Sequence, residues 1–155
     1  MQNLENEVLE RSPLHLLHRV GQCAEDLFQL EMSGLDLTPR QYIVLLTVSK
    51  AEGLSQTDLV EKTGIDRSTM ADLVRRMLKK GLLQRQRSNE DRRAYSVSLT
   101  EQGIRALSAA EPVAIRADDR LLVALPAPMA EEFVSNLNAI IRAFSADRLA
   151  AVQET

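Results

Sequence analysis

Residues 55–81 have the sequence SQTDLVEKTGIDRSTMADLVRRMLKKG, which predicts two short helices joined by a tight turn. Ser55 can cap the first helix, and Gly64 supplies the left-handed conformation at which that helix ends. Asp66 can cap the second helix, which ends at the cations of Lys79-Lys80. The second helix turns an apolar face inward, made of Met70, Leu73, Val74, Met77 and Leu78. The two helices are a predicted helix-turn-helix.

Two predicted strands follow this motif directly. They span residues 83–87 and 94–99, and a polar tip at residues 88–93 connects them. In the second strand, Tyr95, Val97 and Leu99 alternate with Ala94, Ser96 and Ser98. A two-stranded hairpin is marginal alone but becomes stable when it packs beside a helix. The hairpin is therefore a predicted wing.

Further helices are predicted on both sides of the hairpin and the helix-turn-helix. The segment Thr38-Pro39-Arg40-Gln41 is a capping box that opens a helix ending near Lys50. With this helix, residues 37–100 form a predicted winged helix-turn-helix domain. Amphipathic helices within residues 12–36 and 101–152 flank it. The expected fold class is mainly α (α+β).

The flanking helices carry more apolar surface than one small domain covers from a single side. If residues 12–36 and 101–152 of two copies interlock, each copy buries its apolar stripes. The two winged helices then project side by side, as a two-fold DNA site requires. We therefore expect a homodimer. The alternative is a monomer with a helical core.

Positive charge is concentrated in the middle of the chain. Residues 66–93 hold nine basic and four acidic residues, a net charge of +5. The remainder holds ten basic and eighteen acidic residues, a net charge of −8, and the formal total is −3. A local cationic stretch in an acidic chain indicates one anionic partner surface, for which duplex DNA is the expected partner. The alternatives are a solvated charged face and a winged helix used only for protein contact.

The predicted recognition helix from Asp66 to Lys80 supplies most of the candidate DNA contacts. Side chains on its first turns would meet base edges in the major groove, and these candidates are Arg67, Ser68, Thr69 and Asp72. Other side chains would contact phosphates and fix the register, and these are Ser55, Thr57, Arg75 and Arg76. In the wing, Arg92 and Arg93 suit the narrower groove. Asp91 would hold a neighbouring arginine extended.

Composition and motifs argue against other classes of protein. Cys23 is the only cysteine, which excludes an intramolecular disulfide and a cysteine metal cluster and fits a reducing compartment. We find no phosphate loop, nucleophile elbow or metal-ligand spacing, so we expect no enzyme, cofactor or metal site. No apolar run is long enough to span a membrane, and we expect a cytoplasmic protein.

Four short motifs identify a resemblance to a known family. They are Leu37-Thr38-Pro39-Arg40-Gln41, Gly64-Ile65-Asp66-Arg67-Ser68-Thr69, Leu78-Lys79-Lys80-Gly81-Leu82-Leu83, and Asp91-Arg92-Arg93 leading to Leu99-Thr100-Glu101-Gln102-Gly103. Over nearly its whole length the chain resembles the multiple antibiotic resistance regulator (MarR) family. The resemblance implies an obligate dimer that usually represses transcription. It also implies release from DNA by a small molecule bound between the dimerisation helices and the winged helix, and insertion of Arg93 into the minor groove.

The resemblance implies an effector such as an aromatic carboxylate, its thioester or a related lipophilic compound, but the sequence does not name it. One polar face of the first helix carries candidate effector contacts at spacings of three and four, which are His15, His18, Arg19 and Gln22. Arg40, at a helix N-terminus, can also favour an anion. The alternative is that all five are ordinary exposed or interface residues. Some similar regulators sense oxidants, so Cys23 is either a sensor thiol or a small packing residue.

Overall fold

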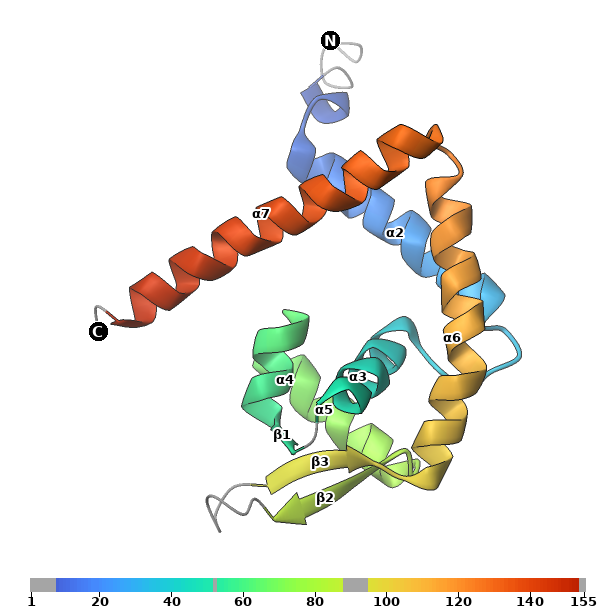
Figure 1. The fold of residues 1–155 in the computed structure, drawn as a ribbon, viewed down its shortest axis with the longest axis vertical. Coiled ribbons are helices and arrows are strands. Elements are labelled where there is room, and N and C mark those ends of the chain that lie inside the picture. Colours follow the sequence, from blue (N-terminus) through green and yellow to red (C-terminus); the bar gives the residue numbers. More distant parts are fainter. Residues whose placement is uncertain (1–7, 52, 88–94, 154–155) are drawn as a thin grey trace. The chain divides into compact units, whose positions relative to one another are not determined.

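The computed structural model describes residues 8–51, 53–87 and 95–153. Within these residues the chain is mostly helical with a small antiparallel sheet, which confirms the expected fold class. In chain order (Figure 1) the elements are α2 (Pro13–Glu31), α3 (Pro39–Lys50), β1 (Leu54–Ser55), α4 (Gln56–Thr63), α5 (Arg67–Lys79), β2 (Leu83–Arg87), β3 (Tyr95–Leu99), α6 (Glu101–Leu122) and α7 (Ala127–Gln153).

Capping boxes begin α3 and α4 at the predicted residues. Before α3, Thr38 Oγ1 accepts a hydrogen bond from the backbone N–H of Gln41 at 3.2 Å, and Gln41 Oε1 accepts one from the N–H of Thr38 at 3.1 Å. Before α4, Ser55 and Asp58 make the same reciprocal pair. Each box satisfies two backbone donors that have no partner inside the helix. The helix starts are therefore fixed by contacts across four residues.

The helix-turn-helix is also formed as predicted. Gly64 ends α4 in the left-handed region with a φ of 72°. Asp66 then caps α5 by accepting a hydrogen bond from the N–H of Thr69 at 2.9 Å. The inward face of α5 joins one core with α3, α4 and the sheet, and its fully buried members are Met70, Val74 and Met77. Packing on this core fixes which face of α5 remains exposed.

The sheet has three strands in the order β1-β3-β2, where the sequence predicted two. Strand β1 pairs with β3 through Leu54 and Val97, and β2 pairs with β3 from Leu83 to Arg87. A two-residue strand is too short to show a periodic pattern, so β1 was not predicted from the sequence. The strand β3 forms as predicted, but burial does not follow the alternation in the sequence: Ser96 and Val97 are both buried, and Tyr95 is exposed. As the middle strand, β3 is covered from both edges.

The end of α5 is joined closely to the start of α6. Gly81 has a φ of 72°, and the Thr100 hydroxyl donates to its carbonyl oxygen. The N–H of Thr100 donates to the carbonyl of Leu82 at 3.2 Å. A Cβ on Gly103 would lie 2.1 Å from the Leu82 carbonyl oxygen, so only glycine fits there. The predicted motif residues Gly81 and Gly103 therefore have a packing function.

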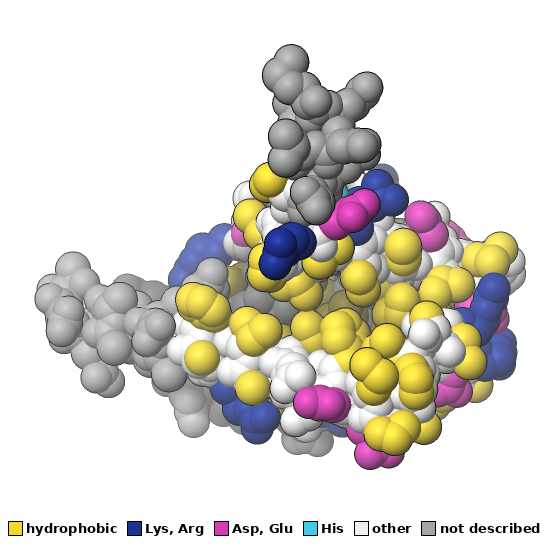
Figure 2. All heavy atoms as spheres, turned by 90° about the horizontal axis from the view of Figure 1, so that it is seen from above, with side chains coloured by type: hydrophobic (Ala, Val, Ile, Leu, Met, Phe, Trp, Pro, Cys, Tyr) yellow, Lys and Arg dark blue, Asp and Glu magenta, His cyan; other side chains and the backbone are white. Residues whose placement is uncertain are grey.

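The chain divides into two compact units, Met1–Asp118 and Asp119–Thr155. In the first unit, α2 leaves Leu14, Leu16, Leu17 and Val20 exposed. In the second unit, α7 leaves Val134, Ile140, Ile141 and Phe144 exposed. Figure 2 shows hydrophobic side chains gathered on the face that it draws. Each of these helices therefore has an apolar stripe that its own unit leaves exposed.

Candidate DNA-binding interface

The first turn of α5 presents polar side chains to solvent. Arg67 and Ser68 are exposed, and Thr69 is half-buried. The Ser68 hydroxyl donates to the Asp66 carboxylate at 2.8 Å, on the same oxygen that caps the helix. Hydrogen bonds donated by Thr69 and Ser68 hold the pKa of Asp66 well below its usual range. Asp66 therefore stays ionised and orders the turn that carries Arg67.

Asp72 connects the two predicted phosphate-contacting arginines. Its Oδ2 lies 2.7 Å from Arg76 Nε, and its Oδ1 forms a salt bridge with Arg75 Nη2. The side chains of Arg75 and Arg76 remain 74% and 65% exposed, against 39% for Asp72. Asp72 therefore holds both guanidinium groups on the exposed face of α5. Base reading by Asp72 remains a prediction, and this ion pairing is a structural use that the sequence did not reveal.

The two predicted phosphate contacts near the start of α4 differ in how free their hydroxyl groups are to bind DNA. The Ser55 hydroxyl donates to Asp58 Oδ2 at 2.7 Å and accepts from the Asp58 N–H at 3.1 Å. The hydrogen bond from the Ser55 side chain lowers the pKa of Asp58. Thr57 is exposed on the first turn of α4. Ser55 thus mainly builds the helix start, whereas the Thr57 hydroxyl is open to a phosphate.

The base of the wing carries a cationic residue that the sequence analysis did not single out. The Arg85 guanidinium carbon lies 5.8 Å from the centre of the Tyr95 ring, a cation–π geometry. The tip residues Asp91, Arg92 and Arg93 lie outside the described residues. Arg85 and Arg87 are two residues apart on β2, so their side chains lie on the same face of the strand. This spacing in the sequence would have identified Arg85 as a candidate.

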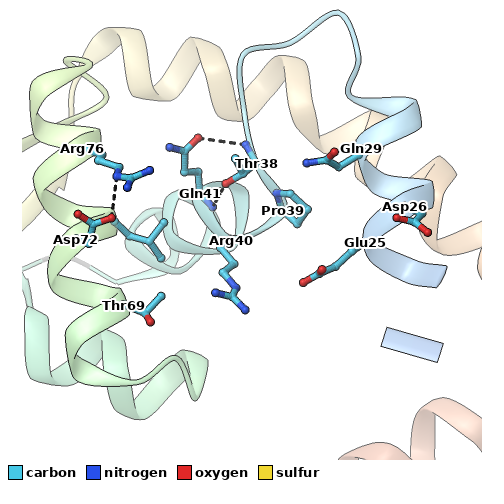
Figure 3. A pocket seen from close by; sticks show the side chains of 11 residues that line it. Glu25, Asp26, Gln29, Thr38, Pro39, Arg40, Gln41, Thr69, Asp72 and Arg76 are labelled. Carbon is cyan, nitrogen blue, oxygen red and sulfur yellow. Dashed lines mark hydrogen bonds and ion pairs between the residues drawn. The ribbon is translucent and has the colours of Figure 1, made fainter. Parts of the chain in front are cut away.

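A cavity of about 540 Å³ lies beside the recognition helix, between α2, the start of α3 and α5 (Figure 3). Arg40 of α3 extends into this space, and Glu25 of α2 extends toward it from the other side. Asp72 and Arg76 form part of the α5 wall. The remaining lining residues are Asp26, Gln29, Thr38, Pro39, Gln41, Thr69 and Leu73. The cavity thus brings acidic and basic groups to the helix that carries the candidate DNA contacts.

Of the five predicted effector contacts, only Arg40 lines this cavity. His15 is half-buried, and His18, Arg19 and Gln22 are exposed along α2. The sequence did not indicate Glu25, Asp26 or Gln29, because only the packing of α2 beside α3 brings them near Arg40. Cys23 is exposed in this chain. It therefore does not pack as a small hydrophobic residue within the protomer.

The fold agrees with comparisons to known proteins. A model described as the MarR family matches residues 35–94. The transcriptional regulator HosA of Escherichia coli O157:H7 is 32% identical over 126 residues, which are 81% of this chain and 92% of that protein. The chain belongs to the MarR family. This MarR-family protein is a winged-helix transcriptional regulator.

Two solved structures extend the comparison to nearly the whole MarR-family fold. One is a structure of BpsR from Bordetella bronchiseptica, whose DNA binding is regulated by 6-hydroxynicotinic acid. That chain is 26% identical with a TM-score of 0.80, covering 84% of this chain and 93% of its own. The other is the transcriptional repressor CouR bound to a 23-mer DNA duplex. It is 29% identical with a TM-score of 0.78, covering 86% of this chain and 94% of its own.

Across residues 8–51, 53–87 and 95–153, no three His, Cys, Asp or Glu side chains are grouped to hold a metal ion. Over the same ranges, no helix combines the length and apolar character needed to cross a bilayer.

Proposed function

We propose that this MarR-family protein is a repressor that binds a two-fold DNA operator as a homodimer and leaves it when a small aromatic acid binds. The observation that carries the DNA-binding proposal is the exposed face of α5. There Arg67 and Ser68 follow a fixed cap, and Arg75 and Arg76 follow on later turns. Such a helix reads bases with its first turns and contacts the backbone with later ones.

The net charge of +5 between residues 66 and 93 supports binding to phosphates. Because neutralising phosphates releases counterions, the affinity for DNA is expected to fall steeply as salt rises. In the proposal, Arg67, Ser68 and Thr69 read bases, and Thr57, Arg75 and Arg76 hold the backbone. Arg92 and Arg93 of the wing enter the minor groove with the support of Asp91.

The homodimer is proposed from the exposed apolar residues of α2 and α7. Contiguous exposed apolar surface in a soluble domain marks an interaction site. We assign residues 12–36 and 101–152 to dimerisation and residues 37–100 to DNA binding. A two-fold dimer would then present two α5 helices to successive turns of the major groove.

The effector site is proposed at the cavity beside α5. Arg40 and Arg76 offer guanidinium groups that pair with carboxylates in a planar, bidentate geometry. Glu25 and Asp26 offer acceptors for ring hydroxyl groups on the same ligand. BpsR, whose DNA binding 6-hydroxynicotinic acid regulates, supports this class of ligand. A carboxylate that pairs with Arg76 competes with Asp72 and disturbs the exposed face of α5.

The DNA-binding proposal is tested by fluorescence anisotropy with a random duplex over a series of salt concentrations. The expected plot of log affinity against log salt is steep, and Arg75→Ala lowers its slope by about one. Arg105→Ala is the matched control, because it removes the same charge from exposed α6. Equal slopes for the two variants, or no dependence on salt, would refute phosphate contact by α5.

The effector proposal has a separate test. Thermal shift and DNA release are measured with 4-hydroxybenzoate for Arg40→Ala and for Arg19→Ala. We expect Arg40→Ala to weaken the response roughly tenfold or more, the loss of a charge-assisted pair, while Arg19→Ala keeps it. A loss confined to Arg19→Ala would move the site to the exposed polar face of α2.

A further inference from the structure

A second cavity lies in the first unit and shares no lining residue with the cavity beside α5. Its walls are the end of α3, the strands β2 and β3, and the first half of α6. Its volume is about 500 Å³, within the range of small-molecule sites. One aromatic ring with a short side chain fits such a space.

One side of this cavity is a single stripe of α6. Ile104, Leu107, Ser108 and Glu111 lie at spacings of three and four residues, so they share one face of the helix. The stripe changes from apolar to acidic along its length. A ligand lying along α6 would therefore contact an apolar surface at one end and a carboxylate at the other.

The floor of the cavity is apolar and well packed. Val48 of α3, Val97 of β3 and Leu107 of α6 are 4–7% exposed and belong to the core cluster of the winged helix. Beside them, Ser98 Oγ is buried and has no hydrogen-bond partner among the residues that the structure describes. A buried hydroxyl without a partner is energetically unfavourable. Ser98 also lines the cavity, so its hydroxyl is a candidate hydrogen-bond partner for a ligand there.

Glu111 is the one charged side chain among the described residues that line this cavity. It is half-buried, and no described Lys, Arg or His forms a salt bridge with it. The pKa of Tyr42 is raised, first by burial and then by the negative charges of Glu111 and Asp118. The charge of Glu111 therefore influences neighbouring groups. A carboxylate in this position attracts a cation and repels a carboxylic acid.

We propose that this cavity binds a small organic cation, with an ammonium group at Glu111 and an aromatic or aliphatic body against Val97, Leu107 and Ile104. This ligand class is opposite in charge to the aromatic acid proposed for the cavity beside α5. The two ligands are expected to bind at the same time, because the two cavities have no residue in common. The site stands whether or not the protein responds to aromatic acids.

The test is isothermal titration of the full-length protein with 2-phenylethylamine, 2-phenylethanol and benzoate. We expect saturable binding of the amine and at least tenfold weaker binding of the neutral alcohol, because only the amine pairs with Glu111. Glu111→Gln should reduce affinity for the amine by a similar factor. Glu101→Gln is the matched control, since it removes the same charge from an exposed position at the start of the same helix.

A second variant checks the location independently of charge. Ser108→Trp places a large side chain at the rim of the cavity from an exposed helix position, and it should abolish binding of the amine. Absence of saturable binding, equal binding of the alcohol, or full affinity in Glu111→Gln or Ser108→Trp would overturn the proposal. DNA affinity of each variant is measured in parallel, so failure of this site is distinguished from failure of DNA binding.

Discussion

Helices α5 and α7 each carry an apolar stripe, but α5 buries its stripe within its own unit whereas α7 leaves its stripe exposed. Met70, Val74 and Met77 of α5 are at most 1% exposed, whereas Ile141 and Phe144 of α7 are 62% and 68% exposed. The winged helix therefore has a complete core in a single protomer. The stripe of α7 is exposed in its own unit, and we assign its cover to a second copy.

The strongest effect is expected from a cavity in the core around α5. Leu45 is fully buried beside this helix, so Leu45→Ala should lower the free energy of unfolding by about 2–5 kcal/mol. Ile141→Ala is the matched truncation on α7 and should cost much less in a protomer at low concentration. Urea denaturation measures the free energy of unfolding of both variants. Similar losses for the two variants would show that α5 and α7 are not buried differently.

The next effect concerns the uncovered stripe. Ile141→Asp places a charge at the proposed dimer interface and should weaken dimerisation at least about 100-fold, as loss of a central contact does. Light scattering after gel filtration measures the mass. Ser135→Asp is the control, because it adds the same charge at an exposed polar position of α7. A dimer that survives Ile141→Asp would exclude this part of α7 from the interface.

The sequence predicted the helix-turn-helix well because its determinants are local. Asp66 and Thr69 form a cap across three residues, and Gly64 sets the turn by its own backbone conformation. The inward positions of α5 follow from helical period alone. Each of these features depends only on residues that are close to one another along the sequence.

Features that depend on distant pairing were missed. Strand β1 exists only because Leu54 lies opposite Val97, and a two-residue segment has no pattern to detect. Ser96 alternates with Val97 in the sequence, yet both side chains are buried, because β3 is the middle strand of the sheet. The cavity that contains Arg40 includes Glu25, and only tertiary packing brings these two side chains together.

The exposed face of α5 should determine specificity, just as its buried face determines stability. Arg67→Ala should cost about 1–3 kcal/mol of discrimination at one base position in each half-site. Binding titrations with matched and mismatched duplexes measure this, and the unfolding free energy should stay unchanged. Equal losses on specific and random DNA would assign Arg67 to the backbone instead.

The smallest effect concerns the cap that positions Arg67. Hydrogen bonds from Thr69 and Ser68 lower the pKa of folded Asp66, so its stabilisation is complete above the ordinary aspartate pKa of about 3.9. That stabilisation is lost as the pH falls toward the lower folded pKa. Asp66→Asn keeps a capping side chain but does not titrate. Its melting temperature should lie below that of the wild type at neutral pH, and the difference should narrow in acid. A gap that does not change with pH would contradict this role of the charge.

In the proposed assembly, two self-contained winged helices are held side by side by the terminal helices of two chains. Hydroxyl-radical footprinting on a duplex selected from a random library tests it most directly. We expect two equivalent protected patches whose centres lie about 34 Å apart, one turn of the double helix. A single patch without a two-fold repeat would contradict it.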